Sequence, residues 1–86
     1  MTTTAERVVR TQRNNLKKVH NKRFTYKDYE YRIEYVGGLS EYIAVDGRKI
    51  GTKVFKSVTG FAGYKFQTAE DVFTHAKTLV MNIVDS

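Results

Sequence analysis

Residues 29–35 constrain the fold of this chain more than any other stretch, because apolar and charged side chains alternate along it. The odd positions hold Tyr or Ile and the even positions hold Glu or Arg, within a longer strand-like run over 24–36 that contains no Pro or Gly. A period of two places the two sets on opposite faces of a β-strand. One apolar and one charged face predict an antiparallel sheet that is covered on a single side.

Turn signals after this strand predict that further strands follow it in an antiparallel meander. Gly37-Gly38 indicates a reversal, 39–45 predicts a second strand, and Asp46-Gly47 predicts a tight type I′ turn into a third strand over 48–56. The segment 57–67 is expected to be a loop or to contain a short strand. The antiparallel sheet over 24–56 therefore has three or four strands.

The last element, 68–84, has the pattern of an amphipathic helix. Thr68 is a candidate N-cap, and the acidic residues just after it suit the positive end of a helix dipole. The apolar residues from Ala69 to Ile83 fall within one arc of the helix. This arc predicts a helix packed across the apolar face of the sheet.

Residues 4–20 are predicted to form a second helix, which is basic. Thr3 and Glu6 have the spacing of a capping box. The apolar stripe consists of Ala5, Val8, Val9, Leu16 and Val19, together with Gln12, and the opposite side carries Arg7, Arg10, Arg13, Lys17 and Lys18. The predicted fold is α+β, in a single domain over 1–86.

Positive charge is concentrated at the N-terminal end. Residues 1–27 contain eight Lys or Arg and one acid, a local charge of +7, whereas residues 28–86 contain seven bases and eight acids, a local charge of −1. Asymmetry of this kind indicates a polyanion, a membrane surface or an acidic protein as partner. The apolar stripe lacks the Trp and Phe that membrane-surface helices insert, so a membrane is not favoured. A solvated helix without a ligand is the remaining alternative.

No group of residues indicates catalysis, so we expect a protein without enzymatic activity, cofactor or metal. The chain has no Cys, which excludes disulfides, thiol nucleophiles and Cys-based zinc sites. His20 and His75 lack Cys or paired carboxylates at metal-ligand spacing. The sequence contains neither a signal-peptide pattern nor an apolar stretch that could span a membrane, so we expect a cytoplasmic protein.

Several aromatic residues adjoin bases, among them Tyr31-Arg32 and Phe55-Lys56. Exposed rings flanked by cations can stack nucleobases while the cations hold phosphates. The alternative is that the tyrosines of 29–35 form the floor beneath the C-terminal helix, because a small domain has few other residues to fill its core.

Three motifs carry a resemblance over residues 29–80. They are the YEYRIEY strand, the DGRK turn and the sequence F-x-T-A-E-D-V that leads into the last helix. In these motifs the chain resembles the three-stranded-sheet-plus-helix DNA-binding modules of the AP2 type and of the arm-binding domains of phage integrases. The resemblance implies that the sheet face away from the helix lies in a DNA major groove, with Arg32, Lys49, Lys53 and Lys56 pointing outward. A small chain without Cys also looks like bacteriophage accessory proteins, many of which bind host proteins.

The sequence therefore supports two hypotheses. The first is a nucleic-acid-binding protein, with DNA favoured over RNA, whose candidate contacts are Arg7, Arg10, Arg13, Lys17, Lys18, Lys22, Arg23, Arg32, Lys49 and Lys53. The second is a phage-type inhibitor or adaptor that docks its basic helix on an acidic host-protein surface.

Overall fold

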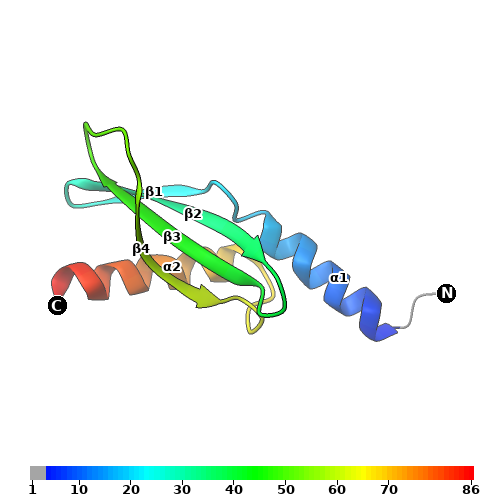
Figure 1. Cartoon of the computed structure of the whole chain (residues 1–86). Coiled ribbons are helices and arrows are strands. Elements are labelled where there is room, and N and C mark those ends of the chain that lie inside the picture. Colours follow the sequence, from blue (N-terminus) through cyan, green and yellow to red (C-terminus); the bar gives the residue numbers. More distant parts are fainter. Residues whose placement is uncertain (1–3) are drawn as a thin grey trace.

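The chain folds as a four-stranded antiparallel sheet with one helix across a face of the sheet and another at its end (Figure 1). The computed structural model describes the backbone of residues 4–86 and the side chains of residues 11–86. The elements are α1 (Thr4–Lys17), β1 (Arg23–Tyr26), β2 (Tyr29–Gly37), β3 (Tyr42–Lys49), β4 (Lys56–Ala62) and α2 (Ala69–Asp85). The strands follow one another in the order β1-β2-β3-β4, which confirms the predicted α+β meander.

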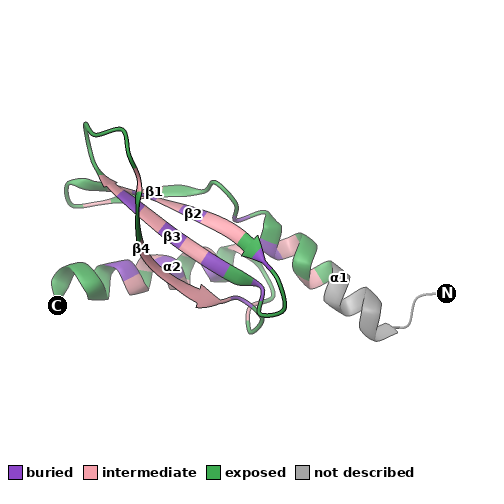
Figure 2. Cartoon of the chain, viewed as in Figure 1, coloured by how far each residue is buried: buried purple, intermediate pink, exposed green. Residues whose placement is uncertain are grey.

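The core lies between the sheet and the two helices. The sheet contributes Tyr31, Ile33, Ile43 and Val45, which all belong to the odd-numbered face of β2 and β3. The buried residues of α2 are Val72, Ala76 and Val80, and the segment at the end of α1 adds Leu16 and Val19. Buried and half-buried positions therefore alternate along most of the two central strands, as the period of two predicts (Figure 2).

The C-terminal helix confirms its sequence signals. The Thr68 hydroxyl accepts a hydrogen bond of 3.1 Å from the backbone N–H of Asp71, so this residue is the N-cap. The helix ends at Asp85, one residue beyond the expected boundary. Within the described chain, neither helix combines the length and the apolar character that crossing a bilayer requires.

The predicted turn at Asp46-Gly47 is wrong, because both residues lie inside β3. Gly47 pairs with Tyr31 of β2, and a Cβ at Gly47 would come within 2.8 Å of the Tyr31 ring. This glycine leaves room for a ring and does not reverse the chain. The reversal comes later, where the Thr52 N–H donates to the Lys49 carbonyl at 3.0 Å and Gly51 has a φ of +100°.

The later turn also changes the third strand. Residues 48–56 were expected to pair with β3, but 50–55 form an extended loop, which we call the arm, that projects beyond the sheet (Figure 1). The predicted loop over 57–67 instead contains most of β4, whose Phe61 pairs with Ile43. A register shift between Val45 and Asp46 places Val58 at a bulge in this pairing.

Two further boundaries differ from the sequence expectation. The run 24–36 is divided into β1 and β2 by a two-residue turn at Lys27-Asp28, where Lys27 has a φ of +55°. The helix α1 ends at Lys17 and not near His20, although Asn21, with a φ of +68°, does turn the chain away. The proposed cap residue Thr3 lies outside the described residues.

Candidate nucleic-acid interface

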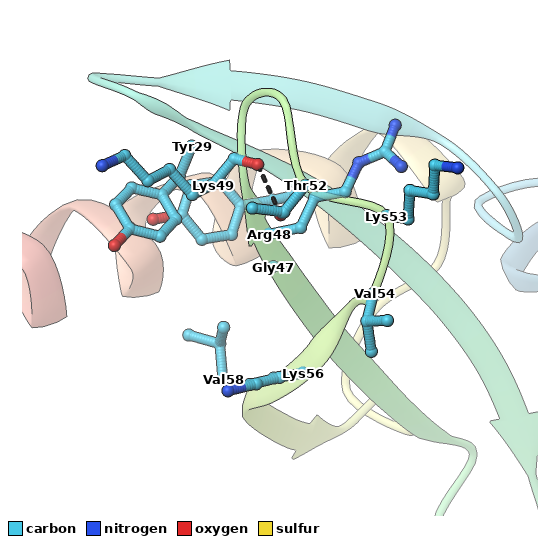
Figure 3. Close-up of a pocket in the computed structure, with 10 residues that line it drawn as sticks. Tyr29, Gly47, Arg48, Lys49, Thr52, Lys53, Val54, Lys56 and Val58 are labelled. Atoms are coloured by element: carbon cyan, nitrogen blue, oxygen red, sulfur yellow. Dashed lines mark hydrogen bonds between the residues drawn. The ribbon is translucent and has the colours of Figure 1, made fainter.

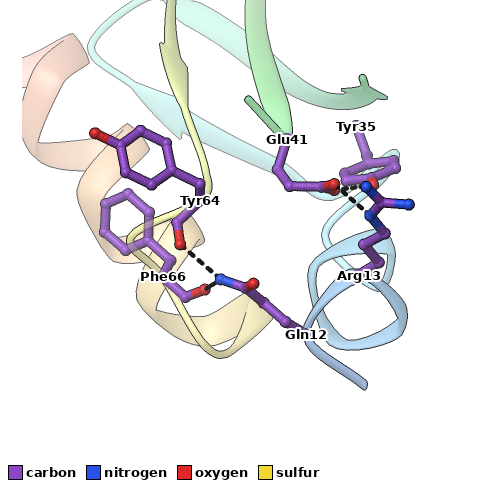
Figure 4. Close-up of polar contacts among 6 residues, drawn as sticks. All are labelled: Gln12, Arg13, Tyr35, Glu41, Tyr64 and Phe66. Carbon is purple, nitrogen blue, oxygen red and sulfur yellow. Dashed lines mark hydrogen bonds and ion pairs between the residues drawn. The ribbon is translucent and has the colours of Figure 1, made fainter. Parts of the chain in front are cut away.

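The described end of α1 is attached to the domain by two of its polar side chains (Figure 4). Gln12 donates to the backbone carbonyls of Tyr64 and Phe66, both at 2.7 Å. Arg13 forms an ion pair of 2.6 Å with Glu41, whose side chain is only 6% exposed. Because the guanidinium compensates a buried carboxylate, Arg13 contributes to the fold and is not a free cation on the helix surface.

Glu41 also binds a tyrosine on its other side. The Tyr35 hydroxyl donates to Glu41, so the Glu41 carboxylate lies between Tyr35 and Arg13 (Figure 4). Burial, and then the hydrogen bond to Glu41, raise the pKa of Tyr35 to about 12. Tyr35 therefore stays neutral and remains a donor throughout the physiological pH range.

The remaining predicted contacts of the helix segment are only partly described. Lys17, Lys18 and Lys22 are exposed and form no ion pair among residues 11–86. The side chains of Arg7 and Arg10 lie outside the described residues. The α1 end of the molecule therefore presents three available lysines.

The outer face of the sheet, which points away from α2, is occupied by paired charges. We call this group the arginine cluster; it consists of Arg23, Glu30, Arg32, Glu34, Asp46, Arg48 and Phe55. Glu30 pairs with Arg48 at 2.7 Å and with Arg23 at 3.5 Å. Arg32 bridges to Glu34 at 3.0 Å and to Asp46 at 3.4 Å. Three cations and three anions leave this face without net charge.

Phe55 covers the three guanidinium groups of the arginine cluster. Its ring centroid lies 4.3 Å from the guanidinium carbon of Arg32, 4.5 Å from that of Arg48 and 5.6 Å from that of Arg23. These distances are within cation–π range. The Arg32 Nε atom is buried and has no hydrogen-bond partner among the described residues. Arg32 and Arg23, both proposed as nucleic-acid contacts, are therefore engaged in ion pairs and ring contacts with the protein's own residues, although the Arg23 side chain is 49% exposed.

A surface pocket at the base of the arm brings together residues that the strand arrangement predicted from the sequence places far apart. We call it the lysine pocket; its volume is about 450 Å³, and its lining includes Tyr29, Tyr31, Gly47, Val58, Lys49, Lys53 and Lys56 (Figure 3). Lys49 lies directly opposite Tyr29 in the β2–β3 register. Lys53 extends from the arm and Lys56 begins β4. The close-up shows Tyr29 and Lys49 on one side of the pocket and Lys53 on the other.

The charged side chains that line the lysine pocket are all positive. No Asp or Glu of the described chain lines it, and Lys49, Lys53 and Lys56 form no ion pair among residues 11–86. Arg48 also lines the pocket, but its guanidinium is held by Glu30. Three uncompensated ammonium groups around an apolar floor provide a binding site for an anion with an aromatic or apolar part.

Sequence reasoning identified Lys49 and Lys53 but not the site that they share. Lys49 was expected on the outer face with Arg32, whereas its register places it opposite Tyr29 on the face that carries the core. Tyr29 was assigned to the core floor, but 44% of it is exposed. The available signal was the row of lysines at 49, 53 and 56, within the arm and at its two ends, and the wrongly predicted turn at Asp46-Gly47 concealed it.

Other chemistry is not evident in the described residues. Residues 11–86 contain no group of three or more His, Asp or Glu side chains that could hold a metal ion. Comparison with known proteins gave no matching family model, no similar curated protein and no similar solved structure.

Proposed function

We propose that this chain is a non-enzymatic nucleic-acid-binding protein that holds its ligand at the lysine pocket. The observation that carries the proposal is the set of three unpaired lysines, Lys49, Lys53 and Lys56, around a pocket that contains the half-exposed ring of Tyr29. Proteins that bind nucleic acids combine cations for the phosphates with rings for the bases. Of the three lysines, Lys53 belongs to the arm, and Lys49 and Lys56 are the strand residues at its two ends.

A second cationic surface lies at the α1 end of the molecule. Lys17, Lys18 and Lys22 lie there, exposed and without ion pairs among the described residues. In the view of Figure 1 the arm and α1 extend from opposite ends of a molecule 51 Å long. A nucleic acid that contacts both ends has to run along the molecule, so the two lysine sets can be tested separately.

A salt titration with two matched triple variants tests the proposal. Each phosphate that a lysine neutralises releases counterions, so the logarithm of affinity falls with the logarithm of salt by about 0.7 per contact on single strands and about 0.9 on duplex DNA. Replacing Lys49, Lys53 and Lys56 by Ala is expected to reduce this slope by about 2–3. The matched control replaces Lys17, Lys18 and Lys22, which removes the same net charge from the other end.

The outcomes separate the possible surfaces. A larger loss of slope in the pocket variant supports the lysine pocket as the main site. A larger loss in the α1 variant moves the site to the helix end, as the sequence hypothesis had it. Absence of binding by the unaltered chain to any nucleic acid at low salt, where the electrostatic attraction is strongest, contradicts the proposal altogether.

A protein partner is the second candidate, and the apolar tip of the arm favours it. Ile50 and Val54 are 58% and 70% exposed, next to the lysines of the pocket. An acidic protein could contact the lysines while covering these two side chains. Such a complex has a shallow salt dependence and loses most of its affinity in Ile50→Ala, whereas nucleic-acid binding tolerates this change, because Ile50 does not line the pocket.

A further inference from the structure

The exposed ring of Tyr29 is the outermost member of a series of three aromatic rings. Its centroid lies 6.3 Å from that of Tyr31, with 29° between the ring planes. Tyr31 in turn stacks on Phe24, at 5.2 Å and 24°. Tyr31 is 3% exposed and belongs to the core, and Phe24 is partly buried against it, so Tyr29 is supported on one side by packed rings. A supported, half-exposed ring provides a rigid platform for another flat aromatic group.

The lysine nearest to this platform is placed by strand pairing. Residues directly opposite each other in antiparallel strands have Cβ atoms roughly 4.5–5.5 Å apart, and Lys49 is directly opposite Tyr29. On the other strand, Tyr26 pairs with Tyr29 and donates to Asp85, whose charge is balanced by Lys27 at 2.6 Å. Asp28, the residue before Tyr29, carries a further carboxylate, but no Asp or Glu of the described residues lines the pocket itself, so its lining attracts an anion.

The volume of the lysine pocket is that of a small-molecule site, because its value of about 450 Å³ lies within the usual range for such sites, roughly 300–1,000 Å³. Lys53 and Lys56 border the pocket on the sides of the arm and of β4, so phosphates on either side of a bound base would meet an ammonium group.

A nucleic-acid duplex cannot place a base on Tyr29 in the lysine pocket. The bases of a duplex are paired and stacked on one another, so their faces are not available to Tyr29. Duplex binding through the sheet requires an electropositive outer face, and that face is neutral and covered by Phe55. From these observations we infer that the lysine pocket takes a single-stranded nucleic acid, with one unpaired base on Tyr29 and the adjoining phosphates on the lysines. This inference rests on the proposed function and specifies its ligand.

The test compares three ligands and three variants of Tyr29. The ligands are a thymidine homo-oligomer, the same oligomer annealed to its complement, and free thymidine monophosphate. Tyr29→Ala is expected to lower affinity for the single strand by about 5- to 150-fold, the effect of removing one base–aromatic stack. Tyr29→Phe keeps the ring and is expected to retain the affinity. Tyr29→Leu keeps apolar bulk without a flat ring and is expected to behave like Tyr29→Ala.

Each result supports or overturns the inference. It is supported if the wild-type chain prefers the single strand, and if Tyr29→Ala removes that preference while Tyr29→Phe does not. It is overturned if duplex and single strand bind equally and Tyr29→Ala changes neither, or if the monophosphate binds as tightly as the oligomer, which identifies a free-nucleotide site. The proposed function survives equal binding of duplex and single strand, and it fails only if neither binds.

Folding is checked on the same variants. Tyr29 is not part of the buried core, so thermal unfolding of Tyr29→Ala is expected to stay close to that of the wild-type chain. A two-dimensional NMR titration with the single strand gives a second measurement that does not depend on the variants. Shifts confined to residues around Tyr29, Lys49 and Lys56 support the site, and shifts confined to α1 overturn it.

Discussion

The arginine cluster and the lysine pocket lie on neighbouring parts of the same sheet and use positive charge in opposite ways. In the cluster, Arg23, Arg32 and Arg48 each have a carboxylate within 3.5 Å and share the ring of Phe55. In the pocket, the three lysines have no ion-pair partner among the described residues. The formal net charge of +6 therefore does not indicate where a polyanion can bind.

The difference follows from the chemistry of the two side chains. A guanidinium group is planar, has several N–H donors in a fixed geometry and stacks on aromatic rings. Arg48 illustrates this, because it donates to Glu30 through both Nε, at 3.0 Å, and Nη2 while it lies over Phe55. A lysine ammonium is compact and strongly hydrated, and it remains available to a ligand. Paired arginines should therefore affect stability, and unpaired lysines should affect binding.

The largest effect on stability is expected at a third location, the ion pair between Arg13 and Glu41. Arg13→Ala leaves a carboxylate with a 6% exposed side chain without its cation, which should cost about 2–3 kcal/mol of unfolding free energy. Urea denaturation measures this loss, with Lys17→Ala as the control on the same helix. If Arg13→Ala instead lowers affinity for nucleic acid and leaves stability unchanged, Arg13 belongs with the lysines. The variant Arg13→Ala/Glu41→Gln should recover part of the loss, because the buried charge is removed.

Arg32→Ala should have the next largest effect, about 2 kcal/mol, because Glu34 and Asp46 both lose their partner. The matched control is Arg23→Ala, whose side chain is 49% exposed and whose pair with Glu30 should contribute about 0.5 kcal/mol. Chemical denaturation of the two variants side by side makes the measurement. Equal effects would show that burial does not distinguish the arginines of the cluster.

Phe55→Ala connects the two regions and should cost about 1–2 kcal/mol, since the ring lies over three guanidinium groups. Phe55 also ends the arm that carries Lys53, so this variant should weaken ligand binding as well. Phe55→Leu is the control that keeps apolar bulk without the π system. Unchanged binding in a destabilised Phe55→Ala would show that the arm does not depend on the cluster.

The smallest effects on stability are expected for the lysines of the pocket. Single replacements of Lys49, Lys53 or Lys56 by Ala should change the free energy of unfolding by less than about 0.5 kcal/mol, as is usual for exposed side chains without partners. Thermal and urea unfolding of the three variants provide the measurement. A loss above about 1 kcal/mol in any of them would identify that lysine as a structural residue and remove it from the binding site.

Much of the fold could be predicted because local patterns and tertiary packing agree. The alternation around Ile33 identified the buried face of β2, and the arc of apolar residues with a Thr68 cap identified α2. The predicted turn was wrong at a place where the sequence contains two turn signals close together, at Gly47 and at Gly51. Asp46-Gly47 has the sequence of a tight turn, yet both residues lie in β3, where the Tyr31 ring fills the space beside Gly47, and the chain turns at Ile50-Gly51.

The sequence by itself determined the two faces of the central strand and the class of the fold. Tertiary structure alone decided which cations are available. Arg32 and Lys49 look equivalent in the sequence, as bases on predicted strands, but the register of β2 and β3 surrounds Arg32 with Glu34 and Asp46 and places Lys49 opposite Tyr29. Strand register changes by whole residues, and a shift of one residue exchanges the faces. The same register places Gly47 beside the ring of Tyr31, sixteen positions away in the sequence, and no local pattern encodes that contact.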